Sequence, residues 1–381
     1  MFTERKTCIF CNCIQLKECV KEDLNIKSPL SYGLTETKND GLFMPYNILI
    51  CNNCKTAQTK YLADLNILYN VNHIDDYGTI KSKKFLEFSD FIKCNKDING
   101  FIEVGTPHCI LANELLSHYS NTPYTIIEPS IKESSSNINI IHSFIEDVDI
   151  DKIQANAIIM SDVFEHFYEP LKVLEKISKS NIKYIYLNHP DFDYHINNNM
   201  FTCLNSEHTF LVEHQFLFSL FENYGFRLNK MKNLNNFSLF LLFERIDNNT
   251  IPFQNRILNI NMPNTIDNYV NSMLNRTTNM NLYMIENKEK KFYIWPSSIH
   301  STTLFQFGLD YKKLSGVLDN SPNKIGKYQY AYNLQCSSFD DMVKNGNEDV
   351  VIFISGAGNY ISELKKIKTN VKIMYLDEFL I

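Results

Sequence analysis

Short apolar runs alternate with amphipathic stretches over most of this chain of 381 residues. In its middle part, the apolar runs predict strands at 101–104, 124–128, 157–160, 184–188 and 237–244. Between these runs, apolar residues at helical spacing predict helices at 110–117, 170–178 and 215–224, and an amphipathic stretch at 83–93 precedes them. Strands that alternate with helices favour a mostly parallel sheet with helices on both faces. We therefore expect a doubly wound, Rossmann-like α/β domain here.

The same alternation returns in the last third of the chain. Apolar runs predict strands at 291–295, 314–318, 350–354 and 371–375, with helices near 302–307 and from Tyr360. Polar residues at 247–250 predict a hinge, and a helical connection is expected at 264–284. The pattern thus indicates a second, smaller Rossmann-like domain.

The first 70 residues have a different pattern. They are rich in cysteine, lack long helical patterns and are interrupted by Pro29, Gly33, Gly41 and Pro45. A small, loop-rich module is typical of such a sequence. A length of 381 residues favours more than one domain, since a domain averages about 150 residues. The three patterns place the expected domains at 1–70, 71–247 and 248–381.

The composition favours a globular protein. Hydrophobic residues make up 44% and charged residues 21%, so the chain can bury cores. The formal net charge of −6 gives no positive field for nucleic acid or anionic lipid. The sequence has no apolar run long enough for a membrane span and no signal-peptide pattern, which predicts a cytoplasmic protein. Its oligomeric state, monomer or dimer, is left open.

Four cysteines form two Cys-x-x-Cys pairs. Cys8 and Cys11 are separated from Cys51 and Cys54 by 39 residues. Two such pairs can close a tetrahedron of thiolates around zinc, a closed structural site that contributes directly to folding. Free thiols or a redox pair are the alternatives, and Cys13 is able to replace Cys11.

Two predicted strand ends carry groups suited to a nucleoside ligand. Glu103 and Gly105 stand where the first strand of the doubly wound sheet turns into a helix, and Glu128 ends the next strand. Glycine permits close approach of a ligand, and a carboxylate accepts hydrogen bonds from ribose hydroxyls. The Gly-x-Gly-x-x-Gly pattern is absent from the sequence, which favours an adenosine-bearing ligand without pyrophosphate. Ordinary strand-end charges are the alternative for both glutamates.

The order of these motifs resembles that of the three-domain S-adenosylmethionine-dependent nucleotide-sugar C-methyltransferases. The resemblance covers nearly the whole chain and is carried by the paired cysteines, the Glu-x-Gly strand end, 126–130 (IIEPS), 161–170 (SDVFEHFYEP), 308–310 (GLD) and 317–327 (VLDNSPNKIGK). It implies a zinc-binding module, a central class I methyltransferase domain and a C-terminal Rossmann-like domain. It also implies a keto-deoxysugar nucleotide as substrate, and S-adenosylmethionine bound near Glu103, Gly105, Glu128 and Asp162.

The resemblance further implies the catalytic groups. Methyl transfer to carbon needs a base for the proton beside a ketone and a donor for the enolate oxygen. By position, His208 matches the family's base, Glu207 the group that orients it or binds sugar hydroxyls, and His166 a second active-site histidine. Asn205 occupies the position of a tyrosine that would stabilise the enolate.

Two departures from the family pattern support alternative functions. The amide of Asn205 in place of a phenol favours sugar O-methylation as one alternative. Pro107 and Cys109 stand where the family has further glycines, which favours a non-catalytic binding or assembly protein on the same scaffold as another.

Overall fold

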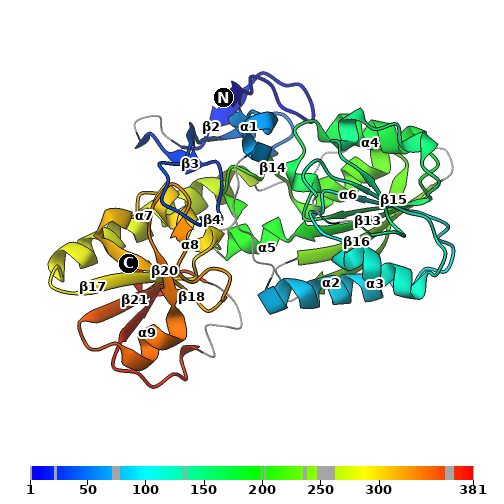
Figure 1. Ribbon diagram of the computed structural model, residues 1–381. Helices are drawn as coiled ribbons and strands as arrows, with labels where there is room; N and C mark the ends of the chain where they lie inside the picture. Colours follow the sequence, from blue (N-terminus) through cyan, green and yellow to red (C-terminus); the bar gives the residue numbers. More distant parts are fainter. Residues whose placement is uncertain are drawn as a thin grey trace.

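The structure is a computed structural model, and it describes residues 2–20, 24–70, 78–131, 133, 135–198, 200, 203–234, 238–246, 262–356 and 364–380. Figure 1 shows a large sheet in the middle part of the chain, a smaller sheet in the C-terminal part, and short N-terminal strands that adjoin both. The predicted hinge at 247–250 and the predicted start of a helix at Tyr360 lie outside the described residues.

The large sheet has seven strands in the order β11-β10-β9-β12-β13-β16-β15. Strands β9 to β13 pair in parallel, whereas β16 pairs antiparallel with β13 and β15 antiparallel with β16. Their bounds are β9 Phe101–Val104, β10 Tyr124–Ile127, β11 Asn139–Ile141, β12 Ala157–Ser161, β13 Tyr184–Pro190, β15 Phe226–Leu234 and β16 Ser238–Arg245. The carboxyl ends of the parallel strands therefore meet along one edge, where ligands of such sheets bind.

Helices cover both faces of this sheet (Figure 1). Alternate strand residues point to opposite faces. Thus Phe101 packs with α2 (Gly78–Lys93) and α3 (Ile110–His118), whereas Ile102 packs with α4 (Pro170–Lys179) and α6 (His214–Asn223). A shorter helix, α5 (Phe192–Asn197), follows β13. The expected doubly wound arrangement is confirmed.

The predicted elements of this part agree with the structure to within a few residues. All five predicted strands and the helices at 110–117, 170–178 and 215–224 are present, and the stretch at 83–93 is the second part of α2. The pattern missed β11 and β15, which form the two edges of the sheet.

The N-terminal part consists of short strands rather than loops alone. They are β1 Phe2–Glu4, β2 Leu16–Glu18, β3 Lys27–Pro29, β4 Leu34–Thr35, β5 Phe43–Pro45, β6 Ile48–Cys51, β7 Ala57–Thr59 and β8 Tyr61–Ala63, followed by α1 (Leu65–Asn70). Two of them pair with distant segments: β14 (Phe210–Leu211) extends the sheet β7-β6-β2, and β19 (Tyr328–Gln329) pairs with β4. Each pairing ties this part to another part of the chain.

The C-terminal part contains a parallel sheet of five strands in the order β20-β18-β17-β21-β22. The strands are β17 Lys291–Trp295, β18 Leu314–Asp319, β20 Cys336–Ser338, β21 Val350–Ile354 and β22 Lys372–Tyr375, with helices α7 (Met262–Glu286), α8 (Ile299–Gln306) and α9 (Phe339–Asn345). The four predicted strands and the connecting helix are confirmed. Strand β20 was missed.

One hydrophobic cluster joins the three parts. It includes Ile48 from the N-terminal part, Phe192 and Leu204 from the middle part, and Tyr269 and Phe305 from the C-terminal part. Most strands pair within one of the three predicted ranges. However, β14 and β19 pair with strands of the N-terminal part, so the parts do not pack as independent bodies. Within the described residues, no helix has both the length and the apolar character needed to cross a membrane.

Candidate active site and metal centre

A hollow opens where β9 and β12 end. It has a volume of about 100 Å³ and is lined by Lys84, Phe85, Gly105, Thr106, Pro107, His108, Ser161 and Asp162. Gly105 has φ +75°, and a Cβ there would lie 2.6 Å from Cγ2 of Val163. Only glycine fits this turn without strain. The space that a Cβ would take is filled by Val163, and Gly105 also lines the hollow.

Asp162 lines the hollow together with a lysine that the sequence analysis had not considered. Both carboxylate oxygens of Asp162 accept hydrogen bonds from Nζ of Lys84 at 2.9 Å, and Oδ2 also accepts one from Asn188 at 3.1 Å. Lys84 belongs to α2, so this ion pair connects the helix to the end of β12. A ligand that binds Asp162 must share it with Lys84.

The two predicted cofactor glutamates are buried and already have partners. Oε1 of Glu128 accepts hydrogen bonds from the backbone N and Oγ of Ser130, at 2.9 and 2.6 Å. Oε2 of Glu103 accepts one from the Tyr124 hydroxyl at 2.7 Å, and burial raises the pKa of Glu103 to about 7. Of the four predicted cofactor residues, Gly105 and Asp162 therefore line the hollow, while Glu103 bonds to the neighbouring strand.

His166 and His208, which the family resemblance assigns to the active site, lie together. Their ring centroids are 5.2 Å apart and the rings are perpendicular. His166 ends the 3-10 turn η4 (Phe164–His166) that follows β12, and His208 precedes β14. The two segments are joined by hydrogen bonds from Thr209 N to Glu165 O, at 2.9 Å, and from Thr209 Oγ1 to Phe167 O, at 2.6 Å. Because η4 continues from the lining residues Ser161 and Asp162, the histidine pair lies on the same sheet edge as the hollow.

The ring of His208 is held from two sides. Its Nδ1 is 3.1 Å from the carbonyl of Cys203, and Phe192 packs edge-on against the ring at 5.4 Å between centroids. Burial, followed in importance by the nearby His166, lowers the pKa of His208 well below its usual value. A neutral ring that donates from Nδ1 leaves a lone pair on Nε2 for a proton or a metal.

Asn205 shapes the turn that carries His208. Its Oδ1 accepts hydrogen bonds from the backbone N of Glu207 and of His208, at 2.8 and 2.9 Å, and its Nδ2 lies 3.2 Å from Nδ1 of His208. The Asn205 side chain is fully buried. These contacts fit a positioning residue, and roles for Asn205 and Glu207 at the substrate stay predictions.

Glu165 is the residue of this site that the sequence analysis missed. Its side chain has no solvent exposure, and neither carboxylate oxygen has a hydrogen-bond partner within the described residues. One oxygen lies 3.9 Å from Nε2 of His166. Burial raises the pKa of Glu165 well above its usual value. The available signal was its place between a strand end and a candidate histidine, but burial is not visible in a sequence.

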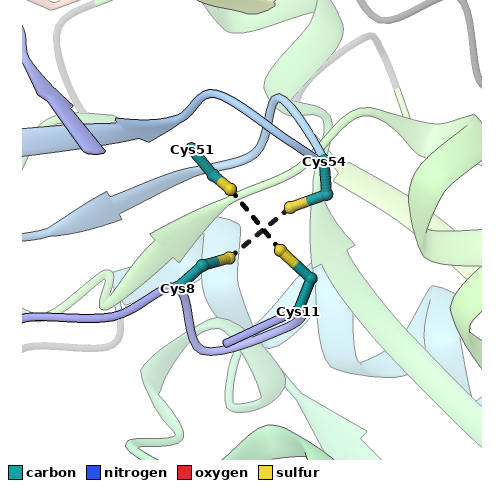
Figure 2. Close-up of side chains that lie close together, drawn as sticks. All are labelled: Cys8, Cys11, Cys51 and Cys54. Atoms are coloured by element: carbon teal, nitrogen blue, oxygen red, sulfur yellow. Dashed lines mark hydrogen bonds between the residues drawn. The ribbon is translucent and has the colours of Figure 1, made fainter. Parts of the chain in front are cut away.

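The four predicted cysteines converge (Figure 2). Sγ of Cys8 is 3.5 Å from that of Cys54, Sγ of Cys11 is 3.5 Å from that of Cys51, and all four sulfurs lie within 4.8 Å of one another. A tetrahedral zinc ion with bonds of about 2.3 Å holds its sulfurs roughly 3.8 Å apart. The donor set and its spacing therefore fit zinc. Cys13 bonds instead to the backbone of Gln15.

Comparisons with known proteins give fold-level similarities only. No protein-family model matches the sequence, and no curated protein matches it. Among solved structures, an O-methyltransferase family protein from Burkholderia thailandensis has 11% sequence identity and a TM-score of 0.34 over 44% of this chain and 60% of its own. A putative O-methyltransferase from Nostoc punctiforme has 14% identity and a TM-score of 0.37 over 43% of this chain and 56% of its own. Human N-acetylserotonin methyltransferase, solved with its methyl donor, has 14% identity and a TM-score of 0.34 over 48% of this chain and 63% of its own. The chain thus spans less than two thirds of each of these proteins.

Proposed function

We propose that this chain is an S-adenosylmethionine-dependent methyltransferase that acts on a nucleotide-linked sugar. The observation that carries the proposal is the strand order of the central sheet. In this sheet, β16 lies between β13 and the edge strand β15, and it pairs antiparallel with both. This order belongs to the class I methyltransferase fold. The glycine turn at Gly105 and the hollow that it lines support the same function.

The residues around the hollow fit the methyl donor. Gly105 lines the hollow, and Glu128, at the end of β10, would accept hydrogen bonds from the ribose hydroxyls in place of those from Ser130. Asp162 adds a carboxylate that lines the hollow itself. When bound, S-adenosylmethionine supplies an electrophilic methyl group.

His208 is the proposed base. With Nδ1 directed to the Cys203 carbonyl, Nε2 would take the proton from the carbon beside the sugar's keto group, which leaves an enolate. The enolate carbon would then accept the methyl group, with the sulfur of the donor as leaving group. His166, perpendicular to it at 5.2 Å, lies where it would contact the same substrate. The sugar and the nucleotide rest on the family resemblance of the sequence.

We also propose that Cys8, Cys11, Cys51 and Cys54 hold a structural zinc ion. Four thiolates leave no open position, so its role is to join the two cysteine loops rather than to act on substrate. The first loop precedes β2, and the second connects β6 to β7, the strand that pairs with β14 next to His208.

Calorimetry with S-adenosylmethionine tests the cofactor site. The wild type should bind, and Glu128→Gln should bind at least about tenfold more weakly because the amide replaces a charged acceptor of two hydroxyls. Glu169→Gln, at an exposed carboxylate, is the matched control and should bind like the wild type. Absence of binding by the wild type would refute the cofactor assignment.

Product analysis tests the reaction. After incubation with keto-sugar nucleotides, mass spectrometry should detect one added methyl group, and NMR should place it on carbon. His208→Ala should abolish turnover and leave cofactor affinity nearly unchanged. A methyl group on oxygen would instead support the O-methyltransferase alternative, and full turnover by His208→Ala would remove the base assignment.

A further inference from the structure

The candidate active site contains a buried carboxylate that has no hydrogen-bond partner within the described part of the chain. Glu165 is fully buried, and within the described residues neither of its oxygens accepts a hydrogen bond. The nearby cation, Lys84, is paired with Asp162 instead. An isolated buried carboxylate is costly, and protonating it would still leave a hydroxyl without an acceptor. Within the described residues, both oxygens are therefore open to a bound ligand.

Two histidines lie close enough to Glu165 to bind the same ligand. A carboxylate oxygen of Glu165, a ring nitrogen of His166 and a ring nitrogen of His208 all lie within 4.8 Å of one another. Bonds of about 2.0–2.2 Å place two ligands of one ion at most roughly 4.4 Å apart, so small side-chain rotations close the set around a cation. We propose that Glu165, His166 and His208 bind a divalent transition-metal ion.

The surroundings of the three side chains suit ligands of a metal. Nδ1 of His208 faces the Cys203 carbonyl, the kind of contact that fixes a ring so that its other nitrogen can coordinate. Backbone bonding between Thr209 and Glu165 holds the two segments together. His166 retains 35% exposure of its side chain, so an ion can enter and positions on it stay open. Imidazole and carboxylate donors also separate this site chemically from the four-thiolate site.

The proposed ion and the proposed proton abstraction use the same nitrogen of His208. A cation on Nε2 occupies the lone pair that the base needs, so the two belong to different states of the protein. The metal site goes beyond the proposed function and does not rest on it. Its test therefore uses neither cofactor nor sugar, and a failure of methyl transfer leaves its result unaffected.

Cobalt(II) is the probe, added to the full-length, zinc-loaded protein. Cobalt bound by imidazole and carboxylate gives visible d–d absorption without the strong thiolate charge-transfer bands that a four-cysteine site produces. We expect one cobalt ion to bind with this spectrum. Glu165→Gln should weaken that binding by at least about 10–100-fold, since even outer partners of metal ligands contribute this much. His142→Gln, at an exposed histidine away from the site, is the matched control and should bind like the wild type.

A second variant separates loss of metal binding from loss of folding. His166 is partly exposed, so His166→Gln should keep the thermal unfolding curve of the wild type while losing cobalt affinity to a similar extent. The proposal is overturned if the wild type shows only thiolate–cobalt bands, or if a folded His166→Gln variant binds cobalt as tightly as the wild type.

Discussion

Replacing Glu103 by Gln should stabilise the protein at neutral pH and remove a specific part of its pH dependence. Glu103 lies on β9 with 1% of its surface exposed, and burial raises its pKa from 4.5 to about 7. A carboxyl group whose pKa is raised by folding stabilises the folded state only while it is protonated. Its contribution is therefore complete below the unfolded pKa and is lost as the pH rises through the folded pKa.

The size of the effect follows from the shift. Each pKa unit corresponds to about 1.4 kcal/mol, so the rise from 4.5 to about 7 amounts to about 3 kcal/mol lost between acidic and mildly alkaline pH. Glutamine has no proton to lose, and its carbonyl can still accept the hydrogen bond that the Tyr124 hydroxyl donates to Glu103. Glu103→Gln should thus resemble the wild type near about pH 4 and gain stability over it up to about pH 8.

Urea unfolding followed over this pH range measures the difference. The free energy of unfolding of the variant, minus that of the wild type, should rise with pH and level off above about pH 7. Glu348→Gln, at an exposed carboxylate, is the matched control. A constant difference for Glu103→Gln, or one that falls with pH, would refute the reasoning that burial governs this group.

Three further predictions concern the turns and contacts around the site. Gly105→Ala should lower the free energy of unfolding by at least about 1–2 kcal/mol, because the position has a positive φ. The new Cβ would also lie 2.6 Å from Val163, so adding Val163→Ala should recover part of the fall in melting temperature. Cys51→Ser should lose one zinc ion per chain by elemental analysis and melt at a lower temperature, and a chelator should lower the melting temperature of the wild type but not of the variant. Tyr32→Phe should destabilise the protein by about 1–3 kcal/mol, because the buried hydroxyl accepts a 2.8 Å hydrogen bond from the backbone N of Ser206; an unchanged melting temperature would contradict this.

In the large sheet, the sequence revealed the central strands and concealed the two edge strands, whereas the edge strand β22 of the C-terminal sheet was predicted. β9 and β12 are apolar runs apart from Glu103 and the terminal Ser161, and such runs predict strands directly. β15 is mostly exposed and rich in polar residues, so its pairing with β16 leaves no periodic signal. The short N-terminal strands were missed for another reason: β7 and β4 complete their pairing with β14 and β19, far away in the chain.

The candidate site was predicted in part for similar reasons. The spacing of the cysteines and the glycine after a strand are local patterns with a direct chemical meaning. In the structure, the four cysteines converge on one point, and Gly105 lines the hollow. His166 and His208 were paired through the resemblance alone, because nothing local shows that two loops 42 residues apart will meet. Glu165 was missed because its distinctive property is burial without a partner, which depends on the packing of several segments.

The position of His208 depends on the cysteine module. β14 has two residues and cannot hold its place alone, so its register comes from β7, where Phe210 lies opposite Gln58 and Thr59 N donates to Thr209 O at 3.0 Å. Arg5 donates to the same carbonyl. The bond from Thr209 N to Glu165 O then fixes the distance between His208 and the turn after β12. A metal ion in the cysteine module would therefore act on the site by holding these strands in register, although it touches none of the groups that would meet a substrate.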